Sequence, residues 1–307
     1  MKADLSVRIG SLVLKNPIIP ASGCFGYGLE YAEVVDLASL GAIAVKGLFL
    51  AEREGHPPPR VVETPSGMLN AIGLQGIGVH RFVSEKMPDL RRLGAVVIVN
   101  ICGSSIDEYV ELARILSDVE GVSALELNIS CPNIKEGGIQ FGCDLASTRA
   151  VVGAVRKATR LPIIPKLTPN VTSVSSFAKA AEDAGADAVS LVNTFLAMVI
   201  DVETRRPKLS NVMGGLSGPA IRPIAVRMVY DCARAVRIPI IGMGGINSAR
   251  DALEFMIAGA TAVQVGTACF VDPFIWPKLL SGIEEYLDRH GIERVADLVG
   301  TLRTDRN

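Results

Sequence analysis

Two lysines and three asparagines lie at the ends of short apolar runs in this sequence. They are Lys46, Lys166, Asn100, Asn128 and Asn193. An ammonium group stabilises negative charge on a ligand, and an amide can both donate and accept hydrogen bonds at the edge of a planar ring. Buried polar groups need partners or a ligand, so these side chains, brought together, predict a site that binds and transforms a polar organic molecule.

A cysteine lies close to this set. Cys131 follows Asn128 by three residues, and a glycine-rich segment, 137–142, comes soon after it. A thiolate can act as a general base near neutral pH. We therefore predict that Cys131 is the catalytic base and that residues 137–142 form a mobile loop over the site. The remaining cysteines, at 24, 102, 143, 232 and 269, are interpreted as packing residues.

Two pairs of small residues could hold a phosphate group. Gly244-Gly245 follows one apolar run, and Gly266-Thr267 follows the next. Glycine lets backbone N–H groups approach an anion, and the N-terminus of a following helix adds a favourable dipole. The sequence has neither a phosphate-binding G-x-x-x-x-G-K-[ST] loop nor G-x-G-x-x-G after a strand. The phosphate is therefore expected on a mononucleotide-type cofactor.

The elements that must position these residues alternate along the chain. Apolar, β-branched runs are separated by helix-like segments, which is typical of parallel β/α units. The eight runs are 17–21, 43–46, 96–100, 124–128, 163–167, 188–193, 239–243 and 262–266. In a TIM (β/α)8 barrel the active site lies at the carboxyl ends of the strands. We predict this fold, in preference to a doubly wound open sheet, with the candidate residues at its mouth.

Further features complete the predicted fold. Alternating apolar residues in 5–14, around Gly10-Ser11, predict an N-terminal β-hairpin that closes the bottom of the barrel. The connections after strands two, four and six are long, and such insertions are usually functional loops. No linker or low-complexity segment divides the chain, so residues 1–307 are interpreted as a single domain.

The composition excludes several classes of protein. A net charge of −1 does not favour nucleic acid or an anionic membrane as a partner. The N-terminus lacks the apolar region of a signal peptide, and no apolar stretch is long enough to span a bilayer. The sequence has no Cys-x-x-Cys pair, and His56, His80 and His290 show no ligand spacing, so we expect no metal site. These features indicate a cytoplasmic protein.

The motifs around the candidate residues resemble those of the dihydroorotate dehydrogenase family. They are 16–23 (NPIIPASG), 69–75 (LNAIGLQ), 128–133 (NISCPN), 166–170 (KLTPN), 214–219 (GGLSGP) and 242–246 (GMGGI). They occur in the family's order and extend over nearly the whole chain. The resemblance implies a barrel that carries FMN at its mouth and oxidises dihydroorotate to orotate in pyrimidine biosynthesis.

Within the family, the chain is most similar to the catalytic subunit of the NAD-linked class 1B enzymes. A Cys base separates it from the membrane-associated class, which uses Ser, and the segment 200–205 (IDVETR) resembles class 1B rather than the fumarate-linked class 1A. The chain has no dinucleotide fingerprint and no cluster motif. The resemblance therefore implies a partner subunit that carries FAD and a [2Fe–2S] cluster and passes electrons to NAD+, in a heterotetramer of two of each chain.

The resemblance also implies a role for each residue. Cys131 would remove the C5 proton of dihydroorotate, Lys166 would stabilise charge on the reduced flavin, and Lys46 would bridge flavin and substrate. The implied substrate-binding residues are Lys46, Asn70, Ala71, Ile72, Gly73, Leu74, Asn128, Asn133, Asn193 and Thr194. The implied cofactor-binding residues are Ser22, Lys46, Gly47, Asn100, Asn128, Lys166, Val192, Gly218, Gly244, Gly245, Gly266 and Thr267.

Other functions stay open on the sequence alone. The nearest is a fumarate-linked class 1A homodimer, and a relative that reduces pyrimidines would share much of the pattern. A non-redox phosphate-binding barrel, such as an aldolase or an isomerase, is the alternative from another class of enzyme. A non-catalytic flavin-binding subunit would be expected to lack the two lysines and the loop thiol.

Overall fold

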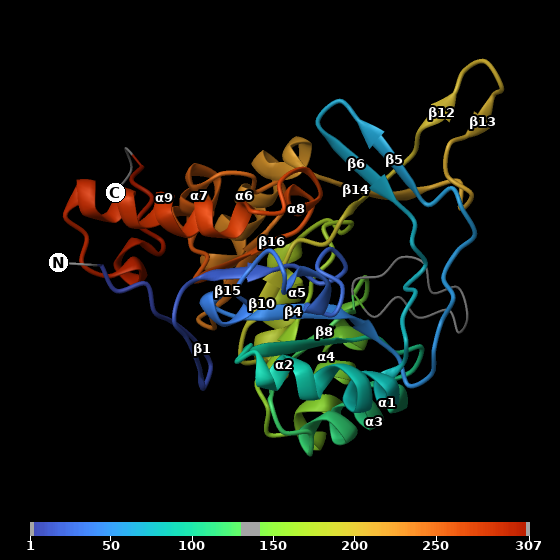
Figure 1. Ribbon diagram of the computed structural model, residues 1–307, viewed down its shortest axis with the longest axis horizontal. Helices are drawn as coiled ribbons and strands as arrows, with labels where there is room; N and C mark the ends of the chain where they lie inside the picture. Colours follow the sequence, from blue (N-terminus) through green and yellow to red (C-terminus); the bar gives the residue numbers. More distant parts are fainter. Residues whose placement is uncertain (1–2, 130–141, 305–307) are drawn as a thin grey trace.

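Eight parallel strands form a barrel in the computed structural model, which describes residues 3–129 and 142–304 (Figure 1). The strands are β3 (Ile18–Pro20), β4 (Ile43–Leu48), β7 (Val97–Ile101), β8 (Val122–Leu127), β9 (Ile163–Pro165), β10 (Val189–Leu191), β15 (Ile240–Met243) and β16 (Ala262–Val265). Hydrogen bonds join them in the orders β4-β7-β8-β9 and β10-β15-β16-β3. A parallel bridge between Lys166 and Ser190 links β9 to β10, and β3 contacts β4. The predicted TIM barrel is confirmed, and each predicted run overlaps one of these strands.

Helices cover the outside of the barrel. They are α1 (Val79–Arg81), α2 (Met87–Arg92), α3 (Ile106–Ser117), α4 (Leu145–Ala158), α5 (Val174–Asp183), α6 (Arg222–Ala233), α7 (Ala249–Ala258), α8 (Ala268–Val271) and α9 (Ile275–His290). Short turns of other helix types are η1 (Leu29–Tyr31), η2 (Leu37–Ser39), η3 (Phe82–Lys86), η4 (Pro219–Ile221) and η5 (Val295–Leu298). Within the described ranges, none of the helices has the length and apolar character needed to cross a bilayer.

The ends of these helices follow local sequence signals. The Ser105 and Ser248 side chains accept hydrogen bonds from backbone N–H groups in the first turns of α3 and α7, which satisfies donors that would otherwise lack partners. Gly94, Gly185 and Gly259 have positive φ angles where the chain turns from a helix into the next strand. Each of these glycines is followed by alanine and ends a helix shortly before the next strand begins.

The N-terminal hairpin lies at the amino end of the barrel. β1 (Val7–Ile9) pairs antiparallel with β2 (Leu12–Leu14), and Gly10 between them has a φ of 58°. A Cβ atom on Gly10 would lie 2.9 Å from the Cβ atom of Asp187, which lies two residues before the start of β10. This contact places the hairpin at the end opposite the strand carboxyl termini, as predicted.

The long connections after strands two and six form an antiparallel sheet, which the sequence did not predict. Its order is β11 (Phe195–Ala197), β14 (Gly214–Ser217), β6 (Gly67–Asn70) and β5 (Val61–Thr64). β12 (Ile200–Asp201) and β13 (Arg206–Pro207) form a hairpin that extends beyond this sheet in Figure 1. The long connection after strand four includes residues 130–141, which lie outside the described residues. Cys131, Asn133 and most of the predicted loop 137–142 fall there.

A glycine substitution tests how helix termination shapes the barrel. Gly259 has a φ of 126°, and a Cβ atom on it would lie 2.4 Å from the Cβ atom of Ala233. Gly259→Ala should therefore lower the free energy of unfolding by about 1–3 kcal/mol, measured by denaturant titration. Gly153→Ala is the matched control, because Gly153 lies inside α4 with open space around it. The control should raise stability by about 0.5–1 kcal/mol, and equal losses in both variants would contradict this account.

Candidate active site

A cavity of about 260 Å³ opens at the carboxyl ends of the barrel strands. Each of the eight strands contributes to the wall of this cavity, either through its own end or through the connection that follows it. The predicted residues that line it are Ser22, Lys46, Gly47, Asn70, Ile72, Gly73, Leu74, Asn100, Asn128, Lys166, Val192, Asn193, Thr194, Gly244, Gly245, Gly266 and Thr267. The structure thus brings together side chains that are spread over most of the sequence.

Two predicted residues are not part of the cavity wall. Ala71 is buried in a small cluster with Leu69 and Leu209, so its side chain faces the packing beneath the antiparallel sheet. Gly218 lies against the turn before β6, and a Cβ atom on it would be 2.6 Å from the Cα atom of Gly67. Both residues lie behind the cavity wall, and their contacts with substrate and cofactor stay predictions.

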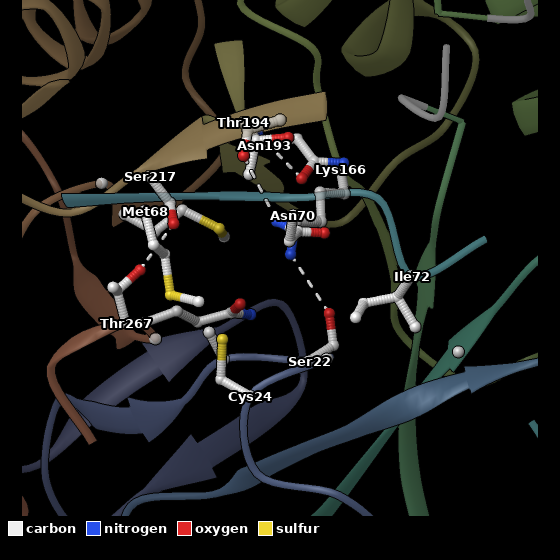
Figure 2. Close-up of a pocket in the computed structure, with 18 of the residues that line it drawn as sticks. Ser22, Cys24, Met68, Asn70, Ile72, Lys166, Asn193, Thr194, Ser217 and Thr267 are labelled. Carbon is white, nitrogen blue, oxygen red and sulfur yellow. Dashed lines mark hydrogen bonds between the residues drawn. The ribbon is translucent and has the colours of Figure 1, made fainter. Parts of the chain in front are cut away.

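Lys166 presents a buried ammonium group at the floor of the cavity. It directly follows β9, and only 5% of the residue is exposed. Its Nζ atom donates a hydrogen bond to Ser22 Oγ at 3.1 Å, and Figure 2 shows the two side chains pointing toward each other. The Nζ atom also lies 3.8 Å from Glu126 Oε2. A buried cation beside a ligand cavity is suited to stabilising negative charge on a bound ring.

Glu126 is a central residue of the site that the sequence analysis missed. It lies within β8, is fully buried, and its two carboxylate oxygens accept hydrogen bonds from four side chains. The donors are Ser22 Oγ (3.1 Å), Asn100 Nδ2 (2.6 Å), Ser190 Oγ (2.9 Å) and Gln264 Nε2 (2.7 Å). The signal in the sequence was a charged residue inside an apolar strand, but the prediction considered only residues at strand ends. We call these residues, with Lys166, the Glu126 network.

Lys46 lies in a different environment. The β4–β7 register shifts between Val45 and Leu48, so Lys46 and Gly47 lie in an irregular part of the strand rather than at its end. Burial lowers the pKa of the Lys46 ammonium from its ordinary value, the positive charge of Arg60 lowers it further, and Glu30 opposes the change. An anionic group bound here would compensate the positive charge of the Lys46 ammonium. Lys46 is therefore placed to bind a carboxylate.

The segment after β6 is held rigidly beside Lys46. Asn70 Nδ2 donates to the carbonyl oxygen of Gly215 at 3.4 Å, which joins the end of β6 to β14. The backbone N–H of His56 donates to the carbonyl oxygen of Ile72, and a Cβ atom on Gly73 would lie 2.5 Å from that same nitrogen. Gly73 and Leu74 both have positive φ angles. The close packing and unusual backbone fix the shape of this part of the wall.

The wall near β15 and β16 has the features expected of an anion site. Gly244 and Gly245 have φ angles of 129° and 76°, and a Cβ atom on Gly245 would lie 2.6 Å from the carbonyl oxygen of Gly218. Thr267 Oγ1 donates to Ser217 Oγ at 2.8 Å, and Figure 2 shows these hydroxyls meeting at the edge of the cavity. Ser217 was not predicted, although it lies within the 214–219 motif.

Comparison with known proteins agrees with this site. The profile of the family described as dihydroorotate dehydrogenase matches residues 4–287. The chain belongs to this family. Proteins of Pelobacter propionicus and Geotalea daltonii are each 55% identical over 302 residues, which cover 98% of this chain and 99% of theirs. A protein of Bacteroides thetaiotaomicron is 52% identical over 300 residues. All three are named dihydroorotate dehydrogenase B (NAD(+)), catalytic subunit.

Membership of the family confirms the resemblance and sets aside the aldolase and isomerase alternatives. Dihydroorotate dehydrogenases depend on FMN, and the residues present fit this group. Gln264 lines the cavity, and its Oε1 atom is buried without a hydrogen-bond partner among the described residues. Such an acceptor suits an N–H group of a planar ring, while the glycines after β15 and β16 suit a phosphate.

The environment of Lys46 gives a prediction about pH. An anion binds Lys46 only while the ammonium is protonated, so affinity for orotate should fall as pH rises through the Lys46 pKa. Because that pKa is lowered, the fall should begin at a lower pH than for an ordinary lysine. Orotate dissociation constants measured between neutral and alkaline pH, from quenching of bound flavin, would show it.

Lys46→Arg is the matched control, because a guanidinium stays charged throughout this range. Any titration of orotate itself affects both proteins equally, so the difference between the two curves isolates Lys46. Parallel curves would contradict the assigned carboxylate contact.

Proposed function

We propose that this chain is the catalytic subunit of an NAD+-linked dihydroorotate dehydrogenase, which oxidises (S)-dihydroorotate to orotate in de novo pyrimidine biosynthesis. Residues 1–307 act as one FMN-binding domain. The observation that carries the proposal is the cavity in which a buried ammonium, that of Lys166, and a half-buried one, that of Lys46, meet a set of amides. The names of the relatives from Pelobacter propionicus and Geotalea daltonii support the NAD+-linked class.

Each group of residues has a part in the reaction. FMN, when bound, supplies the acceptor for the hydride that leaves C6 of dihydroorotate. Lys166 stabilises the negative charge that accompanies this transfer, and Lys46 binds the substrate carboxylate. The amides of Asn70, Asn128 and Asn193, with Asn133 and Thr194, orient the ring by hydrogen bonds.

Cys131 is the proposed base that takes the C5 proton of the substrate. The described cysteine that lines the cavity, Cys24, is a poor alternative, because burial raises the pKa of its thiol to about 12. The nearby thiol of Cys269 and the ammonium of Lys166 add smaller, opposing effects. The position of Cys131 in the 128–133 motif, three residues after the cavity residue Asn128, supports the assignment.

Replacing the base should separate proton abstraction from cofactor binding. Cys131→Ser should retain bound FMN yet slow flavin reduction by dihydroorotate about 10²–10⁴-fold at neutral pH, since a hydroxyl is far less acidic than a thiol. Anaerobic stopped-flow absorbance of the flavin measures this rate. Cys143→Ser, in the same connection at an exposed position, should reduce at the wild-type rate. Similar rates for wild type and Cys131→Ser would remove Cys131 from the mechanism.

The electrons are proposed to leave through a partner. Relatives of this chain are named as catalytic subunits, and the described residues contain no cluster of His, Cys, Asp or Glu that could hold a metal ion. We infer that this chain is cytoplasmic and that a second subunit carries FAD and a [2Fe–2S] cluster, in a heterotetramer of two of each chain. No nucleic acid or membrane takes part.

The choice of electron acceptor tests this arrangement. The flavinated chain alone should reduce an artificial dye with dihydroorotate but should reduce NAD+ only when an iron–sulfur flavoprotein partner is added. Rapid NAD+ reduction by the chain alone would contradict the need for a partner. Turnover with fumarate at the dye rate would favour the class 1A alternative instead.

A further inference from the structure

A carboxylate lies at the centre of the barrel without touching the cavity itself. Glu126 is fully buried and is not part of the cavity wall, whereas its neighbours Ser22, Asn100 and Gln264 are. Burying an ionised carboxylate is costly unless its oxygens are hydrogen-bonded and its charge is paired. Glu126 meets both conditions, because Oε2 also lies 3.8 Å from the ammonium of Lys166. The two opposite charges are thus buried together beneath the site.

The carboxylate dictates how its neighbours are oriented. An ionised carboxylate only accepts hydrogen bonds, so every neutral neighbour must turn a donor toward it. Ser22 donates its hydroxyl hydrogen to Glu126 and so accepts from Lys166 Nζ. Asn100 donates through Nδ2, which turns its Oδ1 toward the amide of Asn128 at 3.3 Å. Glu126 therefore sets the direction of the hydrogen bonds in the network.

Gln264 is the neighbour with a consequence for binding. Its Nε2 atom donates to Glu126 Oε1 at 2.7 Å, so its Oε1 atom is the polar atom left to meet a ligand. That oxygen is buried and has no partner among the described residues, and Gln264 lines the cavity. An unsatisfied buried acceptor is costly, and a ring N–H group of a bound ligand would satisfy it. Oxidised flavin carries such a group on its pyrimidine ring.

We propose that Glu126 is a positioning residue of the flavin site, which fixes the Lys166 ammonium and turns the Gln264 carbonyl oxygen toward the flavin ring. The inference rests on the proposed FMN-dependent function. It assigns Gln264 as a cofactor-binding residue that recognises an N–H donor. It also makes Glu126 the counter-charge of Lys166, so the charge beneath the flavin depends on both residues.

Substitution of Glu126 tests the two consequences separately. Glu126→Gln keeps the shape but removes the charge and introduces a donor, so an amide neighbour such as Gln264 must turn around. FMN should bind the apoprotein about tenfold more weakly, measured by quenching of FMN fluorescence. The uncompensated Lys166 charge should favour binding of reduced over oxidised flavin. The midpoint potential should therefore shift to more positive values, by about 30 mV for each tenfold change in the ratio of the two affinities.

Gln264→Leu separates the acceptor from the charge. This variant lacks the carbonyl oxygen but retains the Glu126–Lys166 pair. It should weaken the binding of oxidised and reduced FMN by about the same factor, on the order of tenfold, and leave the midpoint potential unchanged. If its FMN affinity equals that of the wild type, Gln264 does not bind the cofactor.

Asp187→Asn is the control for loss of a part-buried, ion-paired carboxylate elsewhere in the barrel. Asp187 lies at the amino end, where it pairs with Arg156 at 2.7 Å and accepts from the backbone N–H of Ile163. Because Asp187 is part-buried rather than buried, the control reports loss of a paired carboxylate away from the cavity. This variant should lose stability but keep the wild-type affinity for FMN and the wild-type potential. If Glu126→Gln has a wild-type potential and FMN affinity, the positioning role is overturned. A wild-type protein that binds no FMN would instead overturn the proposed function.

Discussion

The burial of one carboxylate constrains the centre of this barrel. Glu126 of β8 accepts hydrogen bonds from residues of β7, β10 and β16 and from Ser22 after β3, and its charge is opposed by Lys166 after β9. The contacting side chains come from five other strands or the residues that directly follow them. Because breaking a buried pair leaves an uncompensated charge, the network ties the closure of the barrel to the geometry of the cavity above it. The architecture and the site therefore share one polar centre.

The two lysines of the cavity show how environment separates residues of one type. Lys166 is 5% exposed and lies beside a carboxylate, so its charge is compensated within the protein. Lys46 is only half-buried; this burial lowers its pKa, and the positive charge of Arg60 lowers it further. The first lysine is suited to a permanent charge beneath a cofactor, whereas the second gains most from an anionic ligand. This difference agrees with a cofactor at the floor and a carboxylate substrate at the wall.

The sequence was sufficient to predict the barrel and most of the cavity wall, because parallel strands place their carboxyl ends at one face. A residue that ends an apolar run, such as Asn100 or Lys166, could thus be assigned to the mouth without knowing its neighbours. Glu126 and Gln264 were not assigned to the site because they lie inside apolar runs. Their contact inside the barrel becomes evident only from the structure. The antiparallel sheet was not predicted because its strands are short and pair distant parts of the chain, such as Asn70 with Gly215.

The chemistry of the cysteines explains why the base is assigned to the connection after β8 rather than to the barrel wall. Burial raises the pKa of Cys24 and Cys232 to about 12 and also raises that of Cys269. The thiol of Cys102 is buried and donates to Asn100 Oδ1. The tightly packed interior is thus a poor place for a thiolate, because it excludes the water that stabilises the charge. The wall of the cavity is instead suited to fixed charges such as that of Lys166, which the hydride transfer requires.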